Sequence, residues 1–398
     1  MVRYVLLSIL LLLGVHGFIP CQQRASPSKQ LSDSSEGAID IDDVESDVVR
    51  SPLRFLGPYP TMPLRFPGLA TASQKSRNVT GISLDFVLDT AANTNTINAQ
   101  VASELELKKV GEAPGGVGAA GGLMGGDTFL LGDAELDIQQ RETGDKDEVD
   151  NFIFMQGLTA SALPVAAPAA AGLLSLSFFY CFEGGVEFVW GDTTTVPSIT
   201  FYGSDKNLNV NGMARVPFES LPVSMLPSVT ISVNGFEMPA LFDTGSPITV
   251  LNAQAAEAAG IETAIELTEP NEDSDSGWNP FSKMKANFKQ AQELATATAR
   301  GEILTIMGSD GSPLRLVKSK NPQTLSLGAQ TFDAPASQKE DKQYTTLGQN
   351  YCYIGDLPGL AALGGLGDSA PPAAVLGMDF LRLRPRVVFR AQQKEVYI

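Results

Sequence analysis

The sequence contains the stretch Ala240-Leu241-Phe242-Asp243-Thr244-Gly245-Ser246-Pro247-Ile248-Thr249-Val250-Leu251, in which one carboxylate stands at a turn between two apolar segments. Short apolar runs bounded by a Gly-containing turn are typical of buried β-strands. A carboxylate held between such strands is costly to bury unless it is hydrogen-bonded or shares a proton. A single turn of this kind would fit an ordinary hairpin. The stretch decides the fold because the chain contains it twice.

The other copy is Leu84-Asp85-Phe86-Val87-Leu88-Asp89-Thr90-Ala91-Ala92. In both copies Asn-Ala-Gln follows the Asp at the same spacing, beginning at Asn98 and at Asn252. Asn is a favourable helix N-cap, and Ala-rich sequence propagates a helix. Gly260 fits the residue just after a helix end. Each copy therefore predicts a strand, an Asp turn, a second strand and a short capped helix.

The similarity between the two copies continues along the chain. Each copy goes on to a Gly-rich segment, a segment with the pattern of strand-turn-strand, an apolar strand with a short continuation, and a terminal strand. These paired segments are residues 113–126 and 306–312, 129–136 and 325–332, 171–179 and 374–381, and 185–190 and 386–390. Correspondences in the same order predict an internal duplication. A phosphate site in the Gly-rich segments is disfavoured relative to hairpin tips, because neither segment ends in Gly-Lys-Ser/Thr or opens a long helix.

Composition and charge narrow the class of protein. Of the 398 residues, 43% are hydrophobic and 18% charged, which suits a globular protein with a sizeable core. The 38 Gly and 25 Pro favour a β-rich fold with many turns. The formal net charge of −17 argues against nucleic acid as a partner, because a nucleic-acid surface needs clustered Lys and Arg.

The histidine and cysteine content limits the chemistry that is available. The only histidine, His16, lies in an N-terminal segment that we expect to be removed, which excludes Ser-His-Asp and Cys-His catalysis and His-ligated zinc from the mature protein. Three cysteines without Cys-x-x-Cys spacing make no cysteine-rich metal site. Neither a metal nor another cofactor is therefore expected. Cys181 and Cys352 either pair in an oxidising compartment or remain buried thiols.

The N-terminus has the pattern of a targeting segment. Residues 1–17 combine Arg3 with a short apolar core and predict a signal peptide for the secretory pathway. The apolar core is too short for a confident membrane span, so no membrane association is expected after its removal. Residues 18–52 predict a disordered presequence. Phe18-Ile19-Pro20 and the basic stretch after it resemble the bipartite plastid presequence of algae with secondary plastids; the alternative is a secreted or vacuolar protein.

The duplication divides the remaining chain into a first half over residues 53–205 and a second half over residues 206–398. A pseudo-twofold axis between equivalent halves would bring Asp89 and Asp243 face to face. Two carboxylates about 3 Å apart cannot both ionise and therefore share one proton. Such a pair can activate a water that attacks an amide carbonyl, without histidine or metal. Two halves fused in one chain favour a monomer, an intrachain pseudo-dimer.

The segments 241–246 and 374–381 resemble the two signature segments of retropepsin-like aspartic peptidases, related to the pepsin-like enzymes. The resemblance covers roughly residues 75 to 398 as two tandem copies. It implies a mainly β, bilobal acid-protease-like fold of two related β-barrel halves with short helices and the Asp dyad at their interface. It also implies a polypeptide substrate, bound in extended form under a closing flap.

The resemblance assigns roles to particular residues. Asp89 and Asp243 would be the catalytic pair, and Thr90 and Thr244 would brace the two turns against each other. The remaining residues of the supporting turns are Ala91, Gly245 and Ser246, and the candidate flap residues are Gly118, Gly121, Gly122, Gly308, Ser309 and Gly311.

The first copy departs from the family pattern. Ala91 stands where the family has Gly, and a positive φ there would store strain of about 1–3 kcal/mol. Ala92 gives Asp89 no hydroxyl, whereas Ser246 has one that can bond Asp243, and Ser175 stands where the second copy has Gly377. Two functions follow: an aspartic endopeptidase, or a catalytically weak or inactive peptide-binding protein on the same fold. A purely structural β protein leaves the repeated spacing of Asp, Thr and Asn unexplained.

Overall fold

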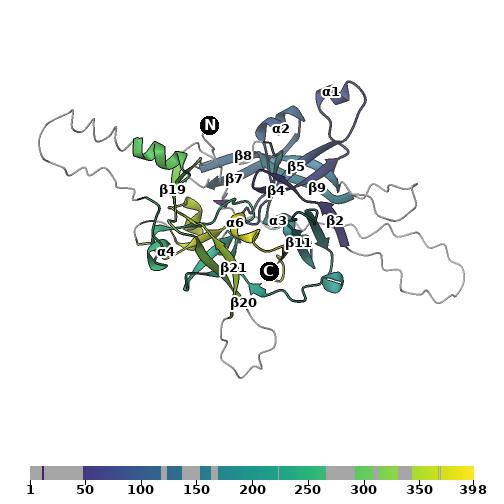
Figure 1. Cartoon of the computed structure of the whole chain (residues 1–398). Helices are drawn as coiled ribbons and strands as arrows, with labels where there is room; N and C mark the ends of the chain where they lie inside the picture. Colours follow the sequence, from purple (N-terminus) through teal and green to yellow (C-terminus); the bar gives the residue numbers. More distant parts are fainter. Residues whose placement is uncertain are drawn as a thin grey trace, which may run out of the picture.

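Apolar runs separated by turns form β-strands throughout the computed structural model (Figure 1). It describes residues 48–117, 123–136, 153–162, 169–222, 224–265, 292–307, 313–329, 343–365, 367 and 369–398, and the backbone of Leu11 and Leu12. The chain is mainly β, with its large sheets in two lobes, so the predicted fold class is confirmed. In Figure 1 the strands labelled β4, β5 and β7 to β9 make the upper lobe, and β19 to β21 belong to the lower lobe.

The sheet of the first lobe has the strand order β1-β7-β8-β9-β6-β10-β5-β4-β3 among the described residues. Two short helices, α1 (Ala72–Lys75) and α2 (Ala99–Glu104), connect its strands. Its strands are β1 (Leu11–Leu12), β3 (Arg54–Leu56), β4 (Tyr59–Phe66), β5 (Ile82–Leu88), β6 (Thr96–Ile97), β7 (Lys108–Val117), β8 (Leu123–Leu136), β9 (Ile153–Ala162) and β10 (Gly172–Leu174).

The sheet of the second lobe has the order β18-β19-β22-β17-β23-β16-β15-β20-β21, with β14 paired to β15. Helix α4 (Ala253–Ala258), the helical residues 292–299 and the 3-10 helix η2 (Pro358–Leu363) belong to this half. Its strands are β14 (Glu219–Ser220), β15 (Pro227–Val233), β16 (Phe236–Phe242), β17 (Val250–Leu251), β18 (Ile303–Met307), β19 (Pro313–Lys318), β20 (Gln323–Ala329), β21 (Gln343–Asn350), β22 (Tyr353–Ile354) and β23 (Ala374–Leu376).

A third sheet joins the two halves, in the order β13-β25-β24-β11-β12-β2. Its central strands β11 and β24 are the predicted terminal strands of the two halves, and they pair antiparallel from Val186 opposite Phe389 to Val189 opposite Arg386. The two halves contribute the same number of strands to this sheet, as expected for two related units. Its strands are β2 (Val48–Pro52), β11 (Gly185–Val189), β12 (Ser198–Tyr202), β13 (Arg215–Pro217), β24 (Arg386–Arg390) and β25 (Glu395–Tyr397).

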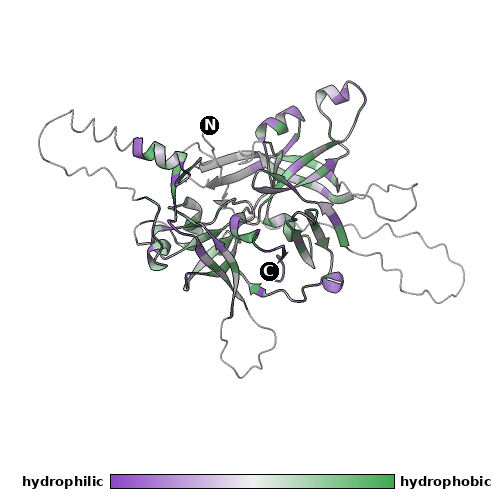
Figure 2. Cartoon of the chain, viewed as in Figure 1, coloured by the Kyte–Doolittle hydropathy of each residue, from purple (hydrophilic) through white to green (hydrophobic). Residues whose placement is uncertain are grey.

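The main hydrophobic core runs through both halves rather than through each separately. Phe389 of the joining sheet stacks on Phe242, at the end of β16, with ring centroids 5.6 Å apart, and on Phe218 at 5.3 Å. It also meets Phe179, in helix α3 (Leu176–Phe179), edge to face at 5.6 Å. Because these rings come from both copies, their burial fixes the halves against each other. Figure 2 shows hydrophobic residues on the strands of both lobes, whereas the outer helix α1 is largely hydrophilic.

Both predicted helix starts are confirmed. Asn98 caps α2 by accepting a hydrogen bond from Gln100 N (2.9 Å), and Asn252 caps α4 by accepting one from Ala255 N (2.8 Å). Gly260 follows α4 with φ +64°, the left-handed conformation that glycine adopts without strain. Glu106 stands at the same distance from its Asp in the first half, and it adopts φ +53°.

Two expectations from the sequence are wrong. Residues 48–52 were placed in the disordered presequence, but they form strand β2, which pairs with β12 and completes the joining sheet. Residues 129–136 were expected to be strand-turn-strand, but they belong to the single strand β8. Gly132, with φ +91°, lies at a register shift between β8 and β9, so it makes an irregularity within a strand rather than a turn.

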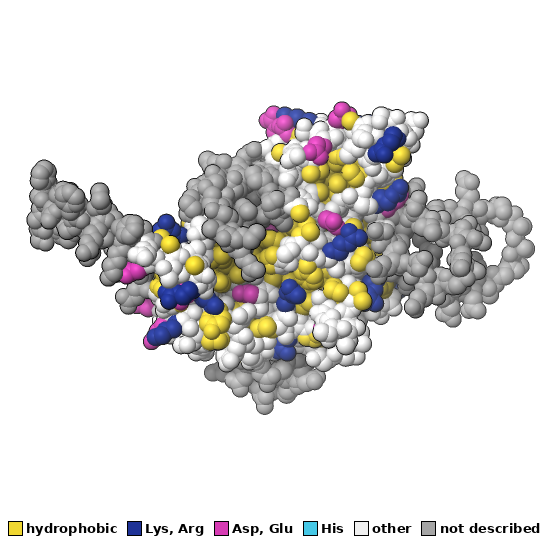
Figure 3. Space-filling model, turned by 45° about the horizontal axis from the view of Figure 1, so that its top comes forward, with side chains coloured by type: hydrophobic (Ala, Val, Ile, Leu, Met, Phe, Trp, Pro, Cys, Tyr) yellow, Lys and Arg dark blue, Asp and Glu magenta, His cyan; other side chains and the backbone are white. Residues whose placement is uncertain are grey.

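The surface carries charges of both signs. Figure 3 shows one face on which hydrophobic side chains gather across the middle, with Lys, Arg, Asp and Glu scattered among and around them. None of the described helices is long and apolar enough to cross a membrane. The cysteines among the described residues, Cys181 and Cys352, form no disulfide bond, so the alternative of a bond between them is not realised.

Candidate active site

The two Asp turns occupy equivalent places in their sheets. In the first half, β5 runs parallel to β10 and Asp89 N donates to Leu174 O at 2.9 Å. In the second half, β16 runs parallel to β23 and Asp243 N donates to Leu376 O at 3.0 Å. The strands on either side of each turn are buried, so each carboxylate is delivered to the same place by the same local fold.

Two threonines tie the turns together across the interface of the halves. Thr90 N donates to Thr244 Oγ1 and Thr244 N donates to Thr90 Oγ1, both at 3.1 Å. Each hydroxyl also donates to the strand before the opposite turn, Thr90 to Phe242 O at 2.7 Å and Thr244 to Leu88 O at 2.8 Å. Both threonines are completely buried, so this reciprocal set holds the two turns at a fixed separation.

The two carboxyl groups are arranged alike and are completely buried. The inner oxygen of each accepts a hydrogen bond at 2.8 Å from the backbone two residues on, Asp89 Oδ1 from Ala91 N and Asp243 Oδ1 from Gly245 N. The outer oxygen Oδ2 of each is also buried, and it has no hydrogen bond of ordinary geometry to any described residue. Buried polar atoms normally have partners, so these two oxygens mark a place for another polar group.

Burial raises the pKa of both carboxyl groups, and their mutual interaction acts on the two pKa values in opposite directions. Burial raises the pKa of Asp89 to about 7, against the lowering effect of hydrogen bonds from Ala91 N, the Asp243 side chain and Ala92 N. Burial, then the negative charge of Asp89, raise the pKa of Asp243 well above its usual value, against hydrogen bonds from Gly245 N and Ser246 N. The side-chain interaction of the pair therefore stabilises charge on Asp89 and the proton on Asp243, and the two titrate as a unit.

Gly245 is required for space rather than for backbone conformation. Its φ is outside the left-handed range, but a Cβ added to it would lie 2.4 Å from both Cγ and Oδ2 of Asp89. Ala91, the equivalent residue, also lacks a positive φ, so the strain considered from the sequence is absent. Ala91 is completely buried and places a methyl group where the second turn has none.

The hydroxyl of Ser246 does not serve the dyad. It donates to Ile248 O at 2.7 Å instead of to Asp243, so the suggested bond to Asp243 is absent. The loss of a hydroxyl at Ala92 therefore removes no hydrogen bond of this kind from Asp89. The first turn departs from the second less at this position than the sequence implies.

Residues that the sequence analysis missed support both turns. In the second half Thr249 Oγ1 accepts from Gly377 N (3.0 Å) and donates to the partly buried Asp379 (2.6 Å). In the first half Asn95 stands at the position of Thr249, and its side-chain oxygen accepts from Ser175 N at 2.9 Å and Ser175 Oγ at 3.1 Å. Ser175 thus stands where the second half has Gly377, and its partner Asn95 stands where the second half has Thr249. The shared spacing from each Asp was visible in the sequence, but the residue types differ.

The candidate flap residues lie outside the described residues: Gly118, Gly121, Gly122, Gly308, Ser309 and Gly311. The strands that precede and follow them are described and pair antiparallel, β7 with β8 and β18 with β19. Both Gly-rich segments therefore connect the strands of a hairpin, as expected.

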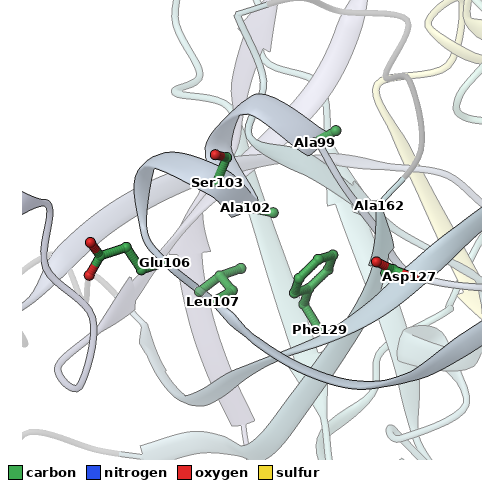
Figure 4. Close-up of a pocket in the computed structure, with 8 residues that line it drawn as sticks. All are labelled: Ala99, Ala102, Ser103, Glu106, Leu107, Asp127, Phe129 and Ala162. Carbon is green, nitrogen blue, oxygen red and sulfur yellow. The ribbon is translucent and has the colours of Figure 1, made fainter.

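A pocket of about 400 Å³ lies elsewhere in the first half, beside α2 (Figure 4). In Figure 4 Leu107 and Phe129 lie between its two acidic side chains, Glu106 and Asp127. Both acids form ion pairs, Glu106 with Lys75 at 2.6 Å and Asp127 with Lys109 at 2.7 Å. The described residues contain no group of His, Cys, Asp and Glu side chains that could hold a metal.

Comparisons with known proteins give no family assignment. No protein-family model and no curated protein matches the chain. Two solved structures match most of it: the crystal structure of edgp, with 12% identity over 88% of this chain and 94% of that one, and the crystal structure of basic 7S globulin from soybean, with 10% identity over 89% and 96%. The TM-score is 0.40 in both cases, which is too low to carry an argument, so the functional case depends on the geometry of the two Asp turns.

Proposed function

We propose that the chain is an aspartic-type endopeptidase that hydrolyses peptide bonds with a water activated between Asp89 and Asp243. The observation that carries the proposal is the pair of buried carboxyl groups, presented by duplicated turns, whose outer oxygens have no hydrogen bond of ordinary geometry to any described residue. Two interacting carboxyl groups that share one proton supply both an acid and a base. This chemistry needs neither histidine nor a metal ion.

One carboxyl group of the singly protonated pair acts as the base and the other as the acid. We assign the base to Asp89, because the side-chain interaction of the pair favours the charge on Asp89 and the proton on Asp243. Asp89 takes a proton from water as the water oxygen bonds to the carbonyl carbon, and Asp243 gives its proton to the carbonyl oxygen. In the second step the C–N bond breaks, Asp89 returns its proton to the leaving amine, and a proton of the diol returns to Asp243. The pair then holds one proton again.

The proposed substrate is a polypeptide in extended form, bound by one monomeric chain. The hairpins β7–β8 and β18–β19 support this, because their connecting segments correspond to the flap of the family that the sequence resembles. Strand β18 lies at the edge of its sheet among the described residues and offers backbone groups to an extended peptide. The same proposal places the protein in the secretory pathway, with the plastid of a secondary-plastid alga, the vacuole or the exterior as its destination.

The test is hydrolysis of oxidised insulin B chain by the full chain between pH 4 and 8. Asp89→Asn and Asp243→Asn should each abolish cleavage, because each removes one of the two proton carriers. Asp85→Asn is the matched control, since Asp85 lies on the same strand as the first turn and forms only a partly exposed ion pair with Arg54. Cleavage that persists unchanged in both dyad variants would exclude the proposed mechanism.

The second candidate is a peptide-binding protein without turnover. It is favoured by the Ala91 methyl, since the equivalent Gly245 approaches the opposite carboxyl group so closely that a methyl there would collide. This candidate predicts that wild type binds pepstatin, a statine-containing peptide, while no product forms from insulin B chain at any pH. Cleavage that depends on Asp89 and Asp243 would eliminate it.

A further inference from the structure

Strand register places Tyr59 beside the first Asp turn. Strand β4 pairs antiparallel with β5, with Thr61 opposite Val87. Continuing this pairing by two residues on each strand brings Tyr59, the first residue of β4, opposite Asp89. Because side chains alternate along a strand, Tyr59 shares a face with Thr61.

The ring of Tyr59 is anchored, but its hydroxyl has no partner. The side chain is only 6% exposed, and the ring packs with Val87, Ala170 and the partly buried Leu56. Its Oη atom is buried and forms no hydrogen bond with any described residue. A buried hydroxyl without a partner is unfavourable, so a phenylalanine would suit this place better if packing alone decided the residue.

The charges of both carboxyl groups act on the hydroxyl of Tyr59. The pKa of Tyr59 is raised, first by burial, then by the negative charge of Asp243 and of Asp89. The strand register, which places Tyr59 opposite Asp89 when it is continued, agrees with this electrostatic effect. Tyr59 Oη and the two Oδ2 atoms are also all buried without a hydrogen bond of ordinary geometry to any described residue. The phenol stays neutral at any working pH and keeps a proton to donate.

The second half has no hydroxyl donor at the position equivalent to Tyr59. In the second half Ser228 pairs with Leu241, and the same continuation by two residues places Leu226 opposite Asp243. Leu226 is completely buried and packs in an apolar cluster with Leu241 and Val250. The duplication therefore does not require a hydroxyl here. The tyrosine is a feature of the first half, whose Asp turn also carries Ala91.

We propose that Tyr59 is a third catalytic residue, whose hydroxyl donates a hydrogen bond to the scissile carbonyl oxygen, on which negative charge develops in the transition state before the proton of Asp243 is fully transferred. This role depends on the endopeptidase function proposed above. Tyr59 donates a hydrogen bond and transfers no proton, so the proton balance between Asp89, Asp243 and the water is unchanged. A donor aimed at developing charge in a water-excluded site stabilises the transition state more than the bound substrate.

The test compares wild type, Tyr59→Phe and a matched control. Tyr59→Phe should lower kcat for insulin B chain by about 100-fold with little change in KM, the size expected for one such donor. Its melting temperature should be unchanged or higher, because the lost hydroxyl has no partner among the described residues. Tyr202→Phe is the control: Tyr202 is equally buried, but its hydroxyl donates to Glu187 at 2.5 Å in the joining sheet. The control should lose stability and keep kcat.

A binding measurement gives a second readout that needs no turnover. Pepstatin carries a hydroxyl that stands in for an oxygen of the tetrahedral intermediate, and a deoxy analogue lacks it. Tyr59→Phe should weaken pepstatin about tenfold and leave the analogue unaffected. If Asp89→Asn and Asp243→Asn abolish cleavage but Tyr59→Phe changes neither kcat nor pepstatin affinity, the role of Tyr59 is refuted alone. If wild-type cleavage is insensitive to both Asp variants, or wild type neither cleaves nor binds pepstatin, the endopeptidase proposal fails, and the Tyr59 role fails with it.

Discussion

The backbone of Gly245 lies directly against the carboxyl group of Asp89, so that one turn of the pair forms part of the surroundings of the acid on the other. A methyl group added at Gly245 would lie 2.4 Å from Asp89 Cγ, closer than Cβ atoms approach other heavy atoms. The equivalent residue of the first turn is Ala91, which already carries that methyl. The two carboxyl groups therefore cannot have identical surroundings.

Gly245→Ala should inactivate the protein. The new Cβ must displace the Asp89 carboxyl group, and a displacement of about 1 Å at a catalytic group can cost about 100-fold in rate. Overpacking in this buried site should also lower the free energy of unfolding by about 1–3 kcal/mol. Activity on insulin B chain and urea unfolding measure the two effects. Gly68→Ala is the matched control, because a Cβ there meets nothing within 4 Å; equal behaviour of the two variants would contradict the contact.

Ala91→Gly should raise activity. Removing the methyl lets the first turn approach Asp243 as Gly245 approaches Asp89, and we expect kcat/KM to rise about tenfold, equivalent to about 1.4 kcal/mol. Glycine also costs about 0.5–1 kcal/mol of stability through the entropy of the unfolded chain. Ala264→Gly, in a bend outside both Asp turns, should show the stability loss without the gain. A fall in activity in Ala91→Gly would mean that the methyl supports the site.

The repeated pattern was sufficient to predict the position of the dyad within the fold. Asp89 and Asp243 are each followed at the same spacing by an Asn that caps a helix, and equal spacing in two copies is hard to satisfy except by equal folds. Local signals of this kind, an N-cap or a Gly after a helix, depend on a few adjacent residues. They survive in both copies, and the structure places both Asp turns alike.

The missed features depend on tertiary pairing. The sequence pattern predicts a turn at Gly132, but strand β8 continues through this residue because β9 pairs with β8 on both sides of it. Residues 48–52 directly follow an acidic run that suggests disorder, yet β12 holds them in a sheet. Asn95 differs from Thr249 in residue type, and Tyr59 differs from Leu226, so comparing the two copies gave no signal for either. Their roles come from contacts between segments far apart in the sequence.

Thr90→Val should destabilise the protein while preserving its shape. Valine has nearly the same volume, but it leaves Thr244 N without its acceptor and Phe242 O without its donor. Each unsatisfied buried group costs about 1–3 kcal/mol, so we expect a loss of about 2–6 kcal/mol in the free energy of unfolding. Thr193→Val, on the exposed surface, should change stability by less than about 0.5 kcal/mol. A Thr90→Val protein as stable as wild type would show that the reciprocal bonds do not hold the turns together.

The raised pKa values of the dyad also predict how stability depends on pH. The pKa of Asp89 is raised from its usual value of 3.8 to about 7 in the folded chain, and that of Asp243 is raised well above the same usual value. Between these values the folded state binds more protons than the unfolded state. Stability then falls as pH rises, because folding must keep a carboxyl group protonated that the unfolded chain would release. The contribution is fully present below pH 3.8 and is lost as the pH passes through the folded-state values.

The double variant Asp89→Asn/Asp243→Asn should therefore have a flatter pH profile of stability than wild type. Each titrating group contributes at most about 1.4 kcal/mol per pH unit to the slope of the unfolding free energy. Urea unfolding at intervals from pH 4.5 to 8 measures both slopes. The partly buried Asp379, whose pKa desolvation raises to about 6, titrates in the same range, but it is present in both proteins and cancels from the difference. Equal slopes in the two proteins would mean that the dyad does not retain its proton on folding.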